Sequence, residues 1–311
     1  MASLLAQLAP ATDAAECAPR SETRLAYRIA DISFGMRARD GLQLELDPSL
    51  QEFAVWRTDC DVNIEVKLVD SLRVPEQERL FASGGLWTLF AEDGGYRLDF
   101  VRTFRRETPY KSAWFDAEFR TGELSLSRRF FSTEKACYPL EYPLDEVLMI
   151  HHLACGKGLE VHALGVVDED GRGHLFLGHS GAGKSTSARL WQMQKGIRIL
   201  SDDRIILRPR DGGIWMHGTP WHGDAGIASP DAAQLTNIYV LEQWPANELV
   251  TMSRSLATAE IFARSFVPRH CPQALEHALG FIEKLSQQVP CETFRFLPEP
   301  SAVEAIRHGR G

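Results

Sequence analysis

The sequence predicts two domains, a mostly antiparallel β domain over residues 21–140 and an α/β domain over residues 141–311. The first observation is a period-two alternation of apolar and polar residues in the first half, which is typical of half-buried strands. The second is a change, after residue 140, to short apolar runs separated by helical patterns. The third is a glycine-rich segment at 178–183 that follows one such run and precedes a helical pattern.

Length and charge limit the classes to which the protein can belong. A chain of 311 residues is long for one compact domain and suits two cores. The formal net charge of −8 argues against a protein that neutralises nucleic-acid phosphates or anionic lipids, so we expect neither a nucleic-acid nor a membrane partner. The sequence contains no run of about 18 apolar residues, so it predicts no membrane span. Six cysteines without a C-x-x-C pair favour reduced thiols in a cytoplasmic protein.

The first domain is expected to follow a short tail. Residues 1–20 lack the basic start and apolar core of a secretory signal, and we expect them to be flexible. Glycines at Asp93-Gly94-Gly95 and Thr121-Gly122 predict hairpin turns, because glycine accepts the positive φ angles of tight turns. Recognition of a substrate or partner is a natural role for this domain. The alternating pattern predicts strands within 42–46, 62–69, 85–104 and 113–131.

The second domain is expected to begin with a helix over 143–155, with Pro143 at its front and glycines at its end. Its apolar runs predict buried strands, and its helical patterns include a closing helix that starts at Ser301. The expected strands are 161–167, 174–178, 197–203 and 291–298, and the expected helices are 187–194, 272–288 and 301–309.

The segment from Gly178 to Thr186 satisfies the phosphate-loop (P-loop) pattern G-x-x-x-x-G-K-[ST] between a predicted strand and a predicted helix. Its glycines let backbone N–H groups point at phosphate oxygens, and the following helix adds its positive N-terminal end. Lys184 would reach the β and γ phosphates of ATP, and Ser185 would bind Mg²⁺. A glycine-rich turn used only for packing is the alternative. The predicted nucleotide-binding residues are Gly178, Ser180, Gly181, Ala182, Gly183, Lys184, Ser185 and Thr186.

Two acids, Asp202 and Asp203, end the apolar strand that follows the loop. One carboxylate can hold Mg²⁺, and the other can accept a proton from a hydroxyl nucleophile. We assign Asp202 to the metal, together with Ser185, and Asp203 to the general base, while the reverse assignment stays open. In the alternative interpretation, both acids only cap a turn.

Together, GHSGAGKST, ILSDD and the preceding strand EVHA resemble HPr kinase/phosphorylase and its relatives. The resemblance implies a P-loop fold similar to the nucleotide-binding half of phosphoenolpyruvate carboxykinase, and it implies that His162 lies in the active site. Softer similarities at 218–223 and near 289–300 point to the relatives that phosphorylate a serine of a precursor peptide. The resemblance covers roughly residues 140–305, and such relatives assemble into oligomers, so a homo-oligomer is a further expectation.

These observations favour an ATP- and Mg²⁺-dependent phosphotransferase. Lys184, Asp202, Asp203 and His162 are its predicted catalytic residues, and the acceptor would be a hydroxyl of a peptide, a protein or a small molecule. The alternative is a nucleotide-dependent regulatory or partner-binding module that transfers no phosphoryl group. A decarboxylating carboxykinase is a more remote possibility, because the chain is short for one and shows no matching substrate half.

Overall fold

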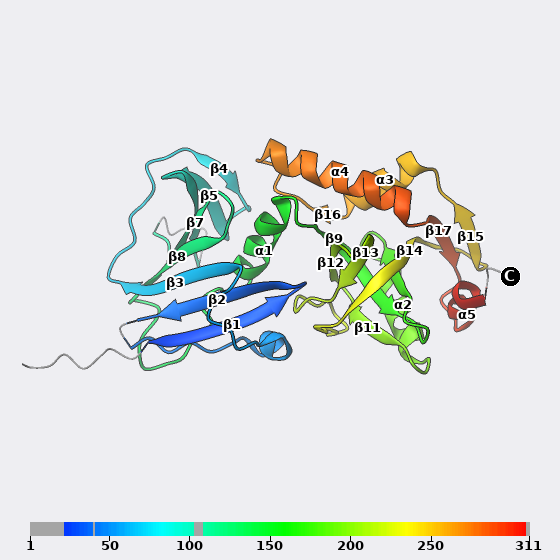
Figure 1. Cartoon of the computed structure of the whole chain (residues 1–311), viewed down its shortest axis with the longest axis horizontal. Coiled ribbons are helices and arrows are strands. Elements are labelled where there is room, and N and C mark those ends of the chain that lie inside the picture. Colours follow the sequence, from blue (N-terminus) through cyan, green and yellow to red (C-terminus); the bar gives the residue numbers. More distant parts are fainter. Residues whose placement is uncertain (1–21, 40, 103–107, 309–311) are drawn as a thin grey trace, which may run out of the picture.

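Two β-sheets lie side by side, with helix α1 (Leu144–Ala154) between them (Figure 1). The structure, a computed structural model, describes residues 22–39, 41–102 and 108–308. The flexible tail predicted for residues 1–20 lies outside these ranges. In the described part, none of the helices combines the length and the apolar composition needed to cross a membrane.

The first sheet has eight strands in the order β1-β2-β3-β8-β7-β6-β5-β4. The pairs β2–β3 and β3–β8 are parallel, and the other neighbouring pairs are antiparallel. The alternating sequence pattern gave no sign of these two parallel pairs, because alternation reports only which face is buried. The strands are β1 (Thr23–Ile29), β2 (Ile32–Ala38), β3 (Val62–Val69), β4 (Arg79–Ala82), β5 (Trp87–Glu92), β6 (Gly95–Phe100), β7 (Lys111–Asp116) and β8 (Thr121–Ser127).

Several strand predictions for this sheet are confirmed. β3 occupies the predicted range 62–69, and its residues alternate between buried and exposed. The predicted turn between β5 and β6 is also confirmed, since Asp93 and Gly94 have φ angles of 50° and 74°. Two consecutive residues with positive φ form the tight turn that suits the twist of a hairpin.

The predicted turn at Thr121-Gly122 is wrong, because both residues lie within β8. The chain reverses at 117–120 instead, where the Asp116 carboxylate accepts hydrogen bonds from the backbone N–H groups of Glu118 and Thr121 at 3.0 and 2.8 Å. Gly122 serves packing, since a Cβ there would lie 2.3 Å from the ring of Phe115.

The strand predicted at 42–46 is also wrong. Only Leu44 forms a bridge, to Cys137, and a short 3-10 helix, η1 (Pro48–Phe53), follows. The alternation in this segment arises because Leu42 and Leu46 are buried in the first core while the segment lacks a full partner strand.

The second sheet has nine strands, and β14 is its central parallel element because it pairs in parallel with both β10 and β17. All other pairings of this sheet are antiparallel among the described residues. The strands are β9 (Leu159–Val167), β10 (Gly173–Leu177), β11 (Arg198–Ser201), β12 (Arg204–Arg210), β13 (Gly213–His217), β14 (Ala232–Gln243), β15 (Glu248–Thr251), β16 (Ser265–Phe266) and β17 (Cys291–Phe296).

Helices cover this sheet on two sides, and each side has its own core. One core includes Ile261 of α3 and Ile282 of α4, and the other includes Trp191 of α2 and Ile306 of α5. The expected alternation of strands and helices fails between residues 198 and 243, where four strands follow one another with no helix between them. The helices are α2 (Lys184–Gln192), α3 (Arg254–Ala263), α4 (Pro272–Gln288) and α5 (Ser301–His308).

Helix α1 follows residue 141 in the chain but packs into the first core. Its Leu144, Leu148 and Leu153 belong to the same buried cluster as residues of the first sheet. The cluster also includes Ile206 of β12 and Trp221, so it extends to the edge of the second sheet. The two halves of the molecule therefore share one continuous apolar contact around α1.

Candidate active site

The glycine-rich loop connects the carboxyl end of β10 to the start of α2, and its glycines are required by close contacts or by positive φ angles. A Cβ on Gly178 would lie 2.7 Å from Cβ of Ala182. Gly183 has a φ of 110°, and a Cβ there would lie 2.6 Å from Cζ of Phe296. Gly181 also has a positive φ, 82°, with no neighbour in reach. The loop therefore holds a compact conformation that residues with side chains could not adopt without strain.

Lys184 is the first residue of α2, and its side chain folds back over the loop. Its Nζ donates a hydrogen bond to Gly178 O at 2.9 Å, and the residue is 8% exposed. Burial lowers the pKa of Lys184; the charge of Asp203 opposes this shift, and the charges of Arg264 and Arg204 add to it.

The other predicted loop residues differ in exposure. Ser180 and Gly181 are exposed, Ala182 is buried, and Ser185 and Thr186 are half-buried in the first turn of α2. The positive end of the α2 dipole and the unpartnered N–H groups favour an anion at this place. The loop is thus suited chemically to phosphate.

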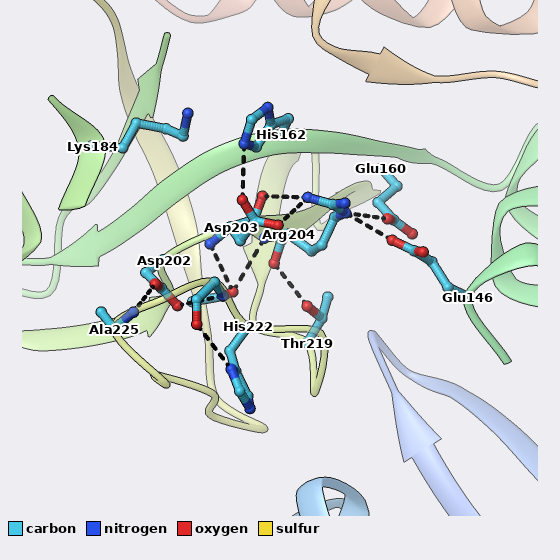
Figure 2. Close-up of polar contacts among 12 residues, drawn as sticks. Glu146, Glu160, His162, Lys184, Asp202, Asp203, Arg204, Thr219, His222 and Ala225 are labelled. Carbon is cyan, nitrogen blue, oxygen red and sulfur yellow. Dashed lines mark hydrogen bonds and ion pairs between the residues drawn. The ribbon is translucent and has the colours of Figure 1, made fainter. Parts of the chain in front are cut away.

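His162 and Asp203 come together from separate segments. His162 lies on β9, and its Nε2 is 2.8 Å from Oδ1 of Asp203, in the bend between β11 and β12. The backbone fixes this pair, since His162 N donates to Arg264 O at 2.8 Å and Ala163 N donates to Asp203 O at 3.1 Å. Both side chains keep some exposure, 30% and 25%. Lys184 lies close enough to this pair for its charge to act on Asp203 (Figure 2).

The carboxylate of Asp203 is surrounded by positive groups. Burial alone would raise the pKa of Asp203, but the hydrogen bond from His162 and the charges of Arg204, His162 and Lys184 outweigh burial and lower it. Asp203 is therefore ionised at neutral pH and can accept a hydrogen bond from a hydroxyl group.

Asp202 points away from this group. Its carboxylate accepts hydrogen bonds from the backbone N–H groups of Gly223, Ala225 and Ile227 at 3.0, 2.9 and 3.4 Å, and the residue is 3% exposed. Figure 2 shows it turned toward Ala225, on the other side from His162. A Cβ on Gly223 would lie 2.9 Å from Oδ2 of Asp202, so glycine leaves space for this carboxylate. A metal ion on Asp202 would compete with these N–H groups.

Arg204 links Asp203 to two buried acids that sequence reasoning did not assign to the site. Its Nη1 donates to Oδ2 of Asp203, and its Nε donates to Oε1 of Glu146 at 2.7 Å and lies 3.7 Å from Oε1 of Glu160. The guanidinium also lies over the ring of Phe266, with Cζ 4.4 Å from the centroid. Burial, and then the charge of Glu146, raises the pKa of Glu160 well above its ordinary value. Arg204 therefore lies between Asp203 and the two buried acids, and burial favours the protonated form of Glu160.

One sequence signal could have found part of this network. Glu160 and His162 are two residues apart on a strand, so their side chains lie on the same face. Glu146 gave no such signal, because it reaches Arg204 from α1, 58 residues earlier in the chain.

The segment 218–223 packs against the bend that carries Asp202 and Asp203. Thr219 Oγ1 donates to Arg204 O at 2.8 Å, and His222 Nδ1 donates to Gly223 O at 3.0 Å. A Cβ on Gly218 would lie 2.1 Å from Ser229 O, so the backbones approach closely here. These contacts explain the glycines of this segment without a direct role in chemistry.

The described residues form no complete metal site of their own. Within the residues that the structure describes, no three His, Cys, Asp or Glu side chains converge on a point that could hold a metal ion. Mg²⁺, however, is commonly bound by one or two protein oxygens together with phosphates and waters. The half-buried hydroxyl of Ser185 is one such protein oxygen.

Comparison with models of protein families found no match to this chain, and comparison with curated proteins found none either.

Proposed function

We propose that this protein is an ATP- and Mg²⁺-dependent kinase that transfers the γ-phosphoryl group to a hydroxyl of a peptide, a protein or a small molecule. The observation that carries the proposal is the grouping of Lys184, on a glycine-rich strand–loop–helix segment, with the hydrogen-bonded pair His162 and Asp203. An anion-binding loop beside an ionised, oriented carboxylate is the arrangement that phosphoryl transfer to an alcohol requires.

In the proposed reaction, the loop and the N-terminal end of α2 bind the phosphates, and Lys184 moves from Gly178 O to the β and γ phosphates. The acceptor hydroxyl donates a hydrogen bond to Asp203. Its oxygen forms the new bond to phosphorus, the bond to the ADP oxygen breaks, and the hydroxyl proton passes to Asp203. A base with a lowered pKa suits a loose transition state, in which orientation and charge neutralisation carry most of the catalysis.

The other residues of the site position these groups. His162 holds one oxygen of Asp203 and Arg204 holds the other, so the carboxylate has a fixed direction. Ser185 and Asp202 are the proposed protein ligands of Mg²⁺. When bound, Mg²⁺ would neutralise the phosphate oxygens. Asp202 already accepts three backbone hydrogen bonds, and a metal ion would compete with these donors. Mutation of Asp202 therefore tests its role as a metal ligand.

A second candidate function has one specific observation in its favour. Glu146 belongs to α1, which packs into the core of the first sheet, and it is ion-paired with Arg204 beside Asp203. A nucleotide that disturbed Asp203 and Arg204 would therefore act on α1 and on the surface of the first sheet. A regulatory module that binds ATP without transferring phosphate would use this connection.

Incubation with γ-labelled ATP and Mg²⁺, alone and with serine-containing peptides or hydroxyl metabolites, tests the proposal. Wild type should label an acceptor, and Lys184→Ala should not. Lys195→Ala, which removes an exposed lysine just beyond α2, is the matched control and should label as wild type does. Transfer retained in a folded Lys184→Ala variant would exclude the kinase. Tight ATP binding without any labelled acceptor, together with partner affinity that changes with ATP, would favour the regulatory module.

A further inference from the structure

The parallel strands β10, β14 and β17 bring a second group of residues to the glycine-rich loop. A Cβ on Gly178 would lie 3.6 Å from Cβ of Leu241, near the end of β14. Two residues further along β14, Gln243 donates a hydrogen bond from Nε2 to Gly181 O at 3.0 Å. The carboxyl end of β14 is therefore attached directly to the loop, and the residue that follows it lies at the border of the proposed phosphate site.

That residue is Trp244, a large aromatic side chain left partly open. It is 41% exposed, and Cζ of Arg295 lies 4.6 Å from the ring centroid, over one face. Arg295 is held in turn by Glu242, with Nε to Oε2 at 3.0 Å, and by Glu248, with Nη1 to Oε2 at 3.7 Å. One face of the indole thus lies against a cation that two carboxylates hold, and the exposed part of the ring is available to a second flat group.

The backbone around Trp244 is also fixed. Trp244 N donates to Phe296 O at 3.0 Å. Three residues later, Asn247 Oδ1 accepts from Leu297 N at 2.9 Å, and its Nδ2 donates to Ser301 Oγ at 3.0 Å. A side chain on such a restrained segment loses little conformational entropy when a ligand binds to it.

We propose that Trp244 is the base-binding platform of the nucleotide site, on which a purine stacks opposite Arg295. This inference rests on the proposed function, because it requires phosphates on the glycine-rich loop. From Leu241, beside Gly178, to Trp244 the chain advances three residues, about 10 Å at ~3.3 Å per residue. This separation leaves space for a ribose between the phosphates and the base. Stacking on an aromatic ring is a common means of holding a nucleic-acid base.

Calorimetric titration of the full chain with two probes, ATP and inorganic tripolyphosphate, both with Mg²⁺, tests the inference. Trp244→Ala should raise the dissociation constant for ATP about tenfold and leave that for tripolyphosphate unchanged. Trp244→Phe should keep most of the ATP affinity, because a stacking ring remains. Trp56→Ala removes a tryptophan that is 103% exposed on the first half of the chain, and it should change neither constant.

The possible outcomes distinguish this inference from the proposed function on which it rests. Unchanged ATP affinity in Trp244→Ala would overturn the platform and leave the kinase standing. Equal weakening of ATP and tripolyphosphate would also overturn it, since Trp244 would then act only by supporting the loop. Failure of wild type to bind either probe would overturn the proposed function, and the platform with it.

Discussion

His162 of β9 and Asp203, in the bend that precedes β12, are joined by a hydrogen bond of 2.8 Å between Nε2 and Oδ1. In the sheet, His162 of β9 pairs with Arg204 of β12. Asp203, the residue before Arg204, therefore presents its carboxylate to the imidazole of His162. This bond fixes which nitrogen carries the proton, because a carboxylate oxygen can only accept. His162 is therefore a donor to Asp203 in the resting protein.

Replacing His162 by alanine should lower phosphoryl transfer roughly tenfold or more, because Asp203 loses the donor that orients it. The melting temperature should change little, since the side chain is 30% exposed and fills no core. Transfer rates and thermal unfolding would be measured together. His277→Ala, at an exposed histidine of α4, is the control. A large loss of melting temperature with normal transfer in the folded fraction would mean that His162 is a structural residue.

Asp202→Asn and Asp203→Asn should differ in kind. Asp202→Asn places an amide NH₂ among three backbone donors and should cost roughly 1–3 kcal/mol of unfolding free energy. Asp203→Asn should leave stability closer to wild type and abolish most of the transfer. Denaturant unfolding and labelled-ATP assays would be run on both variants, with Mg²⁺-dependent ATP binding as a third readout. Identical behaviour of the two variants would refute the separation of roles.

The buried acids that flank Arg204 should also respond differently. Because its raised pKa favours the neutral form of Glu160, Glu160→Gln should change the unfolding free energy little. Glu146→Gln removes the charged partner of Arg204, whose Nε lies 2.7 Å away, and should cost about 3 kcal/mol. Denaturant titrations at pH 7 would measure both changes. A larger loss for Glu160→Gln than for Glu146→Gln would show that the charge resides on Glu160.

Asp145 predicts a pH dependence of stability. Burial raises its pKa to about 7, while the unfolded chain has the ordinary value of 3.8. Between these values the folded protein holds a proton that the unfolded chain has released, so this group lowers stability as pH rises through the window. The full cost, on the order of 4 kcal/mol, is present above about pH 7.

Asp145→Asn should remove that cost, so the variant should gain stability relative to wild type as pH rises from about 4 to 8. Thermal unfolding at a series of pH values would show the gain. Asp70→Asn is the control, because the Asp70 side chain is 94% exposed. A stability difference between Asp145→Asn and wild type that stays constant with pH would contradict the assignment.

The sequence predicted the elements whose signals are local. Helix α4 begins at Pro272 and ends at Gln288, as the helical pattern indicated. β14 escaped notice because Gln234, Thr236 and Asn237 interrupt its apolar pattern, and its identity as a strand depends on partners far away in the chain.

In the candidate site, too, only the features with local sequence signals were predictable. The glycine-rich motif predicted the loop and Lys184, because the conformation of the loop requires glycine for local steric reasons. Adjacent residues at a strand end point to opposite sides, so Asp202 and Asp203 could not both face His162. The pattern could not say which of the two does, because the answer depends on the N–H groups of residues 223–227. Glu146 was unpredictable, since its position follows from the packing of α1.

The packing of α1 has a practical consequence for dissecting the protein. A fragment that starts at residue 141 would carry α1 without the strands that cover Leu144, Leu148 and Leu153. Such a fragment would present an apolar helix to water and would be prone to associate through it. A fragment that starts beyond α1 would instead lose Glu146 and leave Arg204 with one fewer acid. Neither cut preserves both the packing of α1 and its ion pair with Arg204, so activity assays should use the whole chain.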